Sequence, residues 1–295
     1  MPPTIGRIPV LDIWPTVSGG TRATKAVVDE AIRIGATVFR EGHDAVAAEV
    51  VVIDPSGNDH QRVRMEMVGQ GTDRYEATIT LPEMGHWAYR VEAWSDVVGT
   101  WLHHIHVKIP AGVDQELEFA EGVLVLERIA ATVSAADAAI LKALAKDLAD
   151  TNLSPAHRLE RIESPSVLAI LTANPIRELV SEYGPFPVKV ERQRALYGSW
   201  YEFFPRSEGA VQRKDGSWIS GTFKTAAKRL PAVAAMGFDV LYLPPIHPIG
   251  TSFRKGPNNT LTPGPHDPGS PWAIGNKAGG HDAIHPDLGL SLIHI

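Results

Sequence analysis

The segment that most constrains the fold is a β-α-β pattern at residues 198–243. A strand-like run at 198–205 is followed by a helix start at Thr222 and then by apolar residues at helical spacing. Gly237 is expected to end this helix, and Pro231 to kink it. The mainly apolar run at 238–243 then predicts a second strand, parallel to the first and covered on both faces.

A loop rich in Gly, Pro and Asn follows from Pro244 to about Gly280. Loops longer than about 15 residues are usually functional or disordered. This loop leaves the carboxyl end of a parallel strand, which is where barrels and doubly wound sheets carry their active sites. The residues alone therefore indicate an α/β enzyme with its site above the second strand.

The first part of the chain, 1–112, has short strand-like runs separated by turns. Runs with β-branched or alternating patterns occupy 47–54, 74–81, 87–94 and 100–109. Several such strands predict an antiparallel β-sandwich of immunoglobulin-like type.

Residues 113–192 have helical patterns. Ser134 and Asp137 form a capping-box-like start, and three later starts pair a cap residue with proline. These are Ser154-Pro155, Ser164-Pro165 and Asn174-Pro175. Helices this short are marginal alone, so we expect a small bundle, followed by a charged connector at 189–194.

Composition excludes several classes of protein. The net charge is −6 without a long Lys/Arg cluster, which disfavours a nucleic-acid or anionic-membrane surface. The absence of cysteine excludes disulfides, thiolate catalysis and cysteine-bound zinc, and permits a reducing cytoplasm. No apolar stretch approaches the ~20 residues of a membrane span, and the N-terminus lacks a secretory signal pattern.

Three histidines, His103, His104 and His106, suggest metal binding at first sight. In the strand expected at 100–109, His104 and His106 share one face with Lys108. Because no carboxylate joins them locally and a lysine lies beside them, we interpret them as a polar strand face and predict no metal site.

Several motifs in order resemble the bacterial maltosyltransferases that use maltose 1-phosphate, within the α-amylase superfamily. The motifs are Phe39–His43, Gly198–Ser207, Met236–Gly250, Arg254–Asn259, Gly269–Gly275 and Gly279–Gly289. The resemblance covers nearly the whole chain up to Gly289.

This resemblance implies transfer of maltosyl units from α-maltose 1-phosphate to the non-reducing end of α-1,4-glucans, with retention. It implies a sandwich at 1–112, a helical insert at 113–192 and the first β-α-β of a (β/α)₈ TIM barrel at 193–289. It also implies a homodimer through the sandwich and bundle. We further expect a cytoplasmic location, and no cofactor, metal, membrane or nucleic-acid partner.

Retaining transfer needs two carboxylates about 5 Å apart. In this superfamily they follow barrel strands four and five, with a stabilising aspartate after strand seven. The sequence ends after strand two, and residues 290–295 resemble translated adapter read-through. We therefore expect a truncated chain with no catalytic residue, inactive on its own.

Five residues are predicted to bind substrate. The resemblance implies that Lys255 contacts the donor sugar, and a lysine can donate hydrogen bonds to sugar hydroxyls. Asn258 and Asn259 fit sugar contacts and simple turns equally well. His281-Asp282 stands where amylase relatives carry a Tyr-Asp pair, and the histidine puts ring stacking in doubt.

Two other carboxylates, Asp287 and Glu202, are interpreted as structural.

Two alternatives to the maltosyltransferase remain open. One is another hydrolase or branching enzyme of the α-amylase superfamily. The other is a non-enzymatic dimerisation or glucan-binding module.

Overall fold

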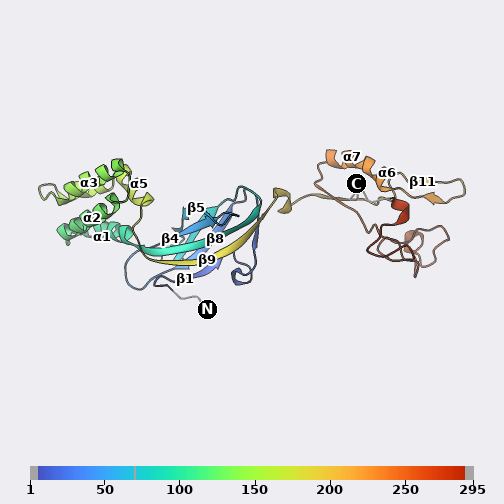
Figure 1. Ribbon diagram of the computed structural model, residues 1–295, viewed down its shortest axis with the longest axis horizontal. Helices are drawn as coiled ribbons and strands as arrows, with labels where there is room; N and C mark the ends of the chain where they lie inside the picture. Colours follow the sequence, from blue (N-terminus) through green and yellow to red (C-terminus); the bar gives the residue numbers. More distant parts are fainter. Residues whose placement is uncertain (1–5, 70, 290–295) are drawn as a thin grey trace. The chain divides into compact units, whose positions relative to one another are not determined.

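The computed structural model describes residues 6–69 and 71–289. The chain forms two compact units, the N-terminal unit Met1–Gln193 and the C-terminal unit Arg194–Ile295 (Figure 1). The tail expected to be non-native, 290–295, lies outside the described residues.

Two β-sheets make up much of the N-terminal unit. The first has the order β1-β3-β7-β6, with antiparallel neighbours: β1 (Val10–Trp14), β3 (Ile32–Val38), β7 (Arg74–Ile79) and β6 (Glu66–Met67). The second has the order β2-β9-β8-β4-β5: β2 (Thr24–Val27), β9 (Arg177–Glu191), β8 (Gly85–Asp96), β4 (Val46–Ile53) and β5 (Asp59–Arg64). Only the β2–β9 pair among these named strands is parallel. A short 3₁₀ turn, η1 (Ser18–Gly20), precedes β2.

Both sheets contribute to one apolar core. Ile34 of β3, Val50 of β4 and Tyr89 of β8 are fully buried in it. The strands expected at 47–54, 74–81 and 87–94 are confirmed as β4, β7 and β8. The buried residues of β7 are Tyr75, Ala77 and Ile79, the alternating set that the sequence places on one face.

The strand expected at 100–109 is wrong, because this segment belongs to helix α1 (Val97–Ala111). Its buried residues are Val98, Trp101, Ile105 and Ile109. Their spacing of three and four places them on one helical face, which the local alternation of β-branched residues concealed. Asp96 caps the helix by accepting a hydrogen bond from the Gly99 amide, 3.1 Å away.

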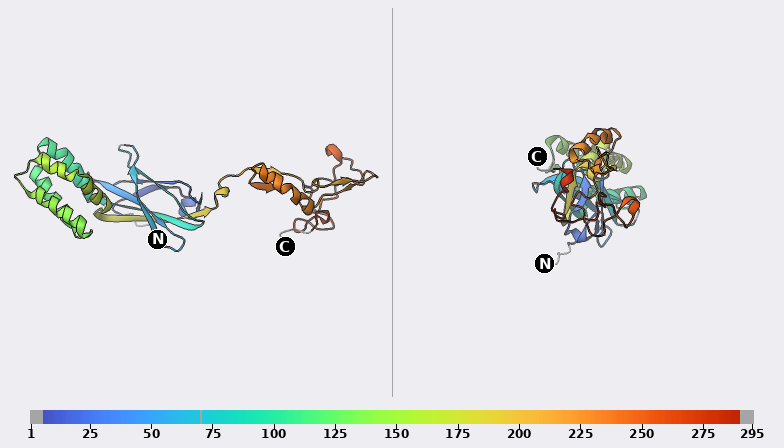
Figure 2. Two further views of the ribbon diagram at one scale, coloured as in Figure 1. Left: turned by 90° about the horizontal axis from the view of Figure 1, so that it is seen from above. Right: turned by 90° about the vertical axis from the view of Figure 1, so that its right-hand side faces the viewer.

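Five helices lie beyond one end of the two sheets in the N-terminal unit (Figures 1 and 2). They are α1, α2 (Gln115–Ala130), α3 (Ala135–Ala149), α4 (Pro155–Ile162) and α5 (Pro165–Ala173). They share a second apolar core, separate from that of the sheets. The starts predicted at Ser134, Ser154 and Ser164 are confirmed.

The helix expected to start at Asn174-Pro175 is wrong, because Asn174 ends α5 and the chain enters β9. β9 runs antiparallel along β8, with Ala93 opposite Ser181 and Trp87 opposite Val188. Partner strands supply backbone hydrogen bonds that no local capping signal reveals. The helices thus begin at Val97 rather than after residue 112. Strand β9 of the second sheet lies within 113–192, the range that the sequence predicts to be helical.

The C-terminal unit contains the predicted β-α-β pattern. Strands β10 (Trp200–Glu202) and β13 (Val240–Tyr242) pair in parallel, with Tyr201 opposite Leu241. The helix between them is broken into α6 (Phe223–Ala226), η3 (Ala227–Arg229) and α7 (Leu230–Ala235).

The predicted start and end of this helical segment are confirmed: Thr222 caps the start of α6, and Gly237, just after α7, takes a left-handed φ of 86°. Pro231, expected to kink the helix, lies in the first turn of α7, directly after the break at η3. A small apolar core between the strands and this helical segment contains the buried residues Phe203, Ala226 and Val233.

Short elements complete this unit: β11 (Val211–Gln212), β12 (Trp218–Ile219), η4 (Pro257–Asn259) and η5 (Pro286–Leu288), while η2 (Gln193–Ala195) spans the division between units. Among the described residues, no helix has the length and apolarity needed to cross a membrane.

Candidate functional site

A pocket of about 730 Å³ lies in the C-terminal unit, beyond the carboxyl ends of β10 and β13. One wall comes from the segment after β10 and the other from the long loop after β13. The lining residues are Arg206, Ser207, Ala210, Trp218, Ile219, Ser220, Ile249, Gly250, Thr251, Arg254, Pro257, His266, Asp267, Pro268, Asn276, His285 and Asp287. Its volume is within the range of small-molecule sites.

Hydrogen bonds to backbone carbonyls hold the two segments that line the pocket in place. The Gly221 amide donates to the Arg206 carbonyl at 2.8 Å, which turns the segment after β10 back on itself. The Asn276 side-chain amide donates to the Ile249 carbonyl at 2.8 Å. The loop after β13 is therefore held by its own polar groups rather than by an extensive apolar core.

A cation and two titratable groups meet at one side of the pocket. Arg206 Nη1 lies 3.6 Å from an Asp287 carboxylate oxygen, and His285 Nδ1 accepts a hydrogen bond from the Asp287 amide at 3.2 Å. Burial lowers the pKa of Arg206, and Asp287 opposes this shift. Burial, followed by the charge of Arg206, lowers the pKa of His285, which favours a neutral imidazole near pH 7.

The pocket lining includes a second pair of charged residues, Arg254 and Asp267, which both bond to the backbone of the loop after β13. Arg254 donates to the Gly264 carbonyl at 2.7 Å, and Asp267 accepts from the Gly264 amide at 2.6 Å. Of the two lining carboxylates, Asp267 thus accepts a backbone hydrogen bond, and Asp287 forms an ion pair with Arg206. The arrangement is suited to binding a polar ligand.

The predicted contacts Lys255, Asn258 and Asn259 lie in the loop after β13. Lys255 is half-buried. It does not line the pocket itself, but in the sequence it stands between Arg254 and Pro257, which do. Asn258 and Asn259 are exposed in the η4 turn, with left-handed φ of 53° and 63°. Asparagine tolerates this conformation, so the turn interpretation accounts for both.

The other predicted contacts, His281 and Asp282, are exposed near the end of the same loop. The His281 ring lies 5.4 Å from that of His247, and Asp282 accepts a hydrogen bond from the Gly280 amide at 3.1 Å. Neither residue lines the pocket.

Sequence reasoning missed the residues that do line the pocket, Arg206, Arg254 and His285 among them. All three lie inside motifs that carry the family resemblance, Gly198–Ser207, Arg254–Asn259 and Gly279–Gly289. The signal was therefore present. However, only the structure shows that residues as far apart in sequence as Arg206 and Asp287 line one cavity.

Residues 6–192 match the family described as alpha-1,4-glucan:maltose-1-phosphate maltosyltransferase, domain N/S. The chain belongs to this family. Its members are named as maltosyltransferases, so it belongs to a family of glycosyltransferase enzymes.

Similar proteins extend the match through the C-terminal unit. Alpha-1,4-glucan:maltose-1-phosphate maltosyltransferase 1 of Streptomyces coelicolor is 54% identical over 289 residues, covering 98% of this chain and 42% of the relative. The Corynebacterium glutamicum protein is 45% identical over 96% of this chain and 43% of its own length. The Mycobacterium tuberculosis H37Rv protein is 40% identical over 96% of this chain and 44% of its own length. The chain thus spans less than half the length of these relatives.

Proposed function

We propose that this chain forms the N-terminal part of an enzyme that transfers maltosyl units from α-maltose 1-phosphate to the non-reducing end of α-1,4-glucans, with retention. The observation that carries the proposal is the 54% identity to a named maltosyltransferase over 98% of the chain. The place of the pocket, at the carboxyl ends of two parallel strands, supports it.

The pocket contributes to the donor side of this reaction. Its polar and charged lining, with Arg206 and Arg254, suits a phosphorylated sugar, which offers many hydroxyl acceptors and an anionic group. Lys255, Asn258, Asn259, His281 and Asp282 remain proposed substrate contacts around this loop. Lys255 is the foremost, because it lies between two lining residues.

The two units have distinct parts in the proposed enzyme. The paired sheets form an immunoglobulin-like sandwich, and β10 and β13 are the first two strands of a (β/α)₈ barrel. The parallel β-α-β arrangement supports the second assignment.

The proposed enzyme is a cytoplasmic homodimer, joined through the sandwich and the helical bundle. Exposed apolar side chains on α1 and α2, namely Val107, Leu117 and Leu124, support an interface there. The absence of cysteine is compatible with the cytoplasm.

A chimera tests the proposed function. Residues 6–289 of this chain replace the matching region of the Streptomyces coelicolor maltosyltransferase 1, and phosphate release from α-maltose 1-phosphate is measured with a glucan acceptor. We expect activity within about tenfold of the parent enzyme, because few contacts should be lost at this identity. A folded chimera without phosphate release would contradict the proposal.

The pure 295-residue chain is the matched control. It should release no phosphate, because the displacement needs two carboxylates that follow strands four and five in this superfamily. Turnover by this chain alone would overturn the assignment of its C-terminal unit to the first two barrel strands.

A further inference from the structure

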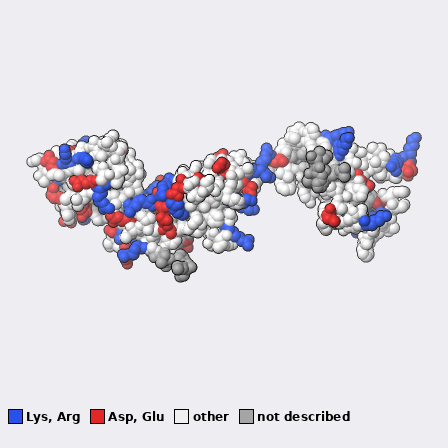
Figure 3. Space-filling view, viewed as in Figure 1, with Lys and Arg blue, Asp and Glu red and all other residues white. Residues whose placement is uncertain are grey.

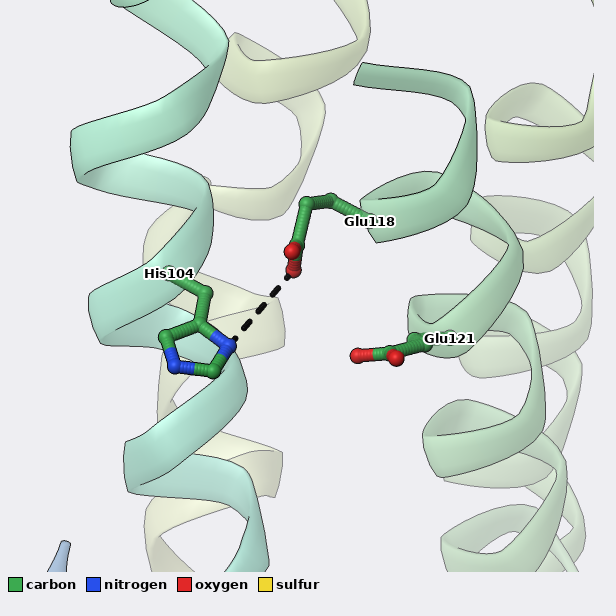
Figure 4. A group of neighbouring side chains, drawn as sticks. All are labelled: His104, Glu118 and Glu121. Atoms are coloured by element: carbon green, nitrogen blue, oxygen red, sulfur yellow. Dashed lines mark ion pairs between the residues drawn. The ribbon is translucent and has the colours of Figure 1, made fainter. Parts of the chain in front are cut away.

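Helices α1 and α2 bring three metal-ligating side chains together on their facing sides (Figure 4). His104 comes from α1, while Glu118 and Glu121 are one turn apart on α2. We propose that His104, Glu118 and Glu121 bind a divalent transition-metal ion, with Zn²⁺ as the representative ion. The site needs only one copy of the chain and is independent of the proposed maltosyl transfer.

The buried carboxylate of Glu118 is the observation that points to a ligand. Glu118 is only 1% exposed, yet its Oε2 atom has no hydrogen-bond partner in the part of the chain that the structure describes. Its Oε1 atom accepts from the Lys108 ammonium. Leaving a buried carboxylate oxygen unpaired is costly, and Oε2 lies 3.8 Å from His104 Nδ1.

The local charge leaves room for a divalent cation. Lys108 contacts Glu118 and lies 3.9 Å from an Asp114 oxygen. The third carboxylate, Glu121, has an oxygen within 4.8 Å of the Glu118 carboxylate. One ammonium charge is thus set against three carboxylate charges. A divalent cation would neutralise the remaining net charge of −2.

The spacing of the ligand atoms is close to what zinc requires. One atom from each residue lies within 4.8 Å of the others. Tetrahedral zinc with bonds of about 2.0–2.1 Å places its ligand atoms roughly 3.4 Å apart. His104 and Glu118 need to approach by only a few tenths of an ångström. Glu121 is exposed and can rotate inward, and water would fill the fourth position.

The donor set selects the kind of metal. One imidazole nitrogen with two carboxylates suits zinc and similar ions, whereas calcium and magnesium prefer oxygen ligands throughout. A bound ion would tie α1 to α2 and stabilise this helical hairpin.

The helix explains why sequence reasoning dismissed these histidines. In a strand at 100–109, His104 and His106 share one face that has no carboxylate. In α1 they are two residues apart and diverge: His106 pairs with Glu163 at 3.0 Å, while His104 faces α2. The carboxylates come from 14 and 17 positions further along the chain.

Zinc titration of the 295-residue chain tests the site. The chain is stripped with a chelator, and Zn²⁺ binding is measured by calorimetry at pH 7.5 in the wild type, His104→Ala, Glu121→Gln and His103→Ala. We expect one micromolar or tighter site per chain in the wild type. His104→Ala and Glu121→Gln should weaken it at least about tenfold.

His103→Ala is the matched control, because it removes an exposed imidazole from the same helix that is not one of the three proposed ligands; its ring centroid lies 6.3 Å from that of His104. Its affinity should equal that of the wild type. Glu121 is exposed, so Glu121→Gln should fold, and circular dichroism checks this. No saturable binding at micromolar Zn²⁺, or equal affinity in His104→Ala and the wild type, would overturn the proposal.

Discussion

The two units differ in how completely their apolar surfaces are covered. In the N-terminal unit, two sheets share one core and five helices share another. In the C-terminal unit, the side chains of Trp200 and Tyr242 on the paired strands remain 63% and 43% exposed, and Phe204 is 37% exposed. Burying three such side chains contributes roughly 5–9 kcal/mol, comparable to the whole stability of a domain.

The polar surfaces differ as well. On the second sheet of the N-terminal unit, Glu92 is buried among three guanidinium groups, those of Arg62, Arg90 and Arg177. Acidic and basic side chains lie side by side over this unit (Figure 3). In the second sheet of the first unit, buried charge is thus paired at Glu92, while the second unit holds a pocket with mainly local loop contacts.

Limited proteolysis should show the largest difference between the units. We expect a resistant core that ends near residue 193, with cleavage sites in 194–289 cut at least about tenfold faster, because cleavage follows the population of opened states. Mass spectrometry of the digest locates the cuts. Protection that extends through Leu243 in the isolated chain would contradict the comparison.

A core substitution in the bundle should have the next largest effect. Leu126 on α2 is fully buried, so Leu126→Ala should lower the free energy of unfolding by about 2–5 kcal/mol in urea denaturation. Glu127→Ala is the control, because Glu127 is exposed on the same helix and its loss should cost under about 0.5 kcal/mol. Equal losses would mean that the second core is not packed as described.

Sequence predicted the fold best where local signals decide it. Caps and prolines located α3, α4 and α5, and the β-α-β pattern located β10 and β13. It failed at α1 because the local alternation of β-branched residues concealed the helical spacing of Val98, Trp101, Ile105 and Ile109. It failed at β9 because this strand pairs with β8 across about 90 residues, which no local signal reveals. The immunoglobulin-like type and the barrel assignment stay predictions.

The site was predictable as a region but not as a set of residues. The loop after the second strand does line the pocket, as the carboxyl-end rule indicates. The pocket also needs Arg206 from the segment after β10, and the pairing of a half-buried cation with His285 has no signature in the sequence. The roles of Lys255, Asn258, Asn259, His281 and Asp282 stay predictions.

Lys255 offers a sharper test of the pocket in the C-terminal unit. In the active chimera, Lys255→Ala should lower kcat/KM for α-maltose 1-phosphate by roughly 10- to 150-fold, because a hydrogen bond from a charged donor contributes about 1.5–3 kcal/mol. Lys277→Ala is the control, since Lys277 is exposed on the same loop. Equal kinetics in both variants would make Lys255 an ordinary solvated lysine.

The buried ion pairs of the N-terminal unit predict a dependence of its stability on pH. Burial opposes ionisation of Glu92, but hydrogen bonds from Arg177, Arg62 and Arg90 outweigh it and lower its pKa to about 2. A carboxyl with a lowered pKa in the folded state contributes stability above its unfolded pKa, near 4.5. That contribution is lost as the pH falls from about 4.5 towards 2.

Urea denaturation of the wild type and Glu92→Gln at pH 7 and pH 3 measures this contribution. At pH 7 the variant should be less stable, because three guanidinium groups lose a buried partner. At pH 3 the difference should narrow by about 1–3 kcal/mol, since protonation of the unfolded wild type removes part of its advantage. The matched control is Glu160→Gln, which removes an exposed carboxylate and should leave stability nearly unchanged at both values. A difference between wild type and Glu92→Gln that is the same at pH 7 and pH 3 would show that the Glu92 charge does not stabilise this sheet.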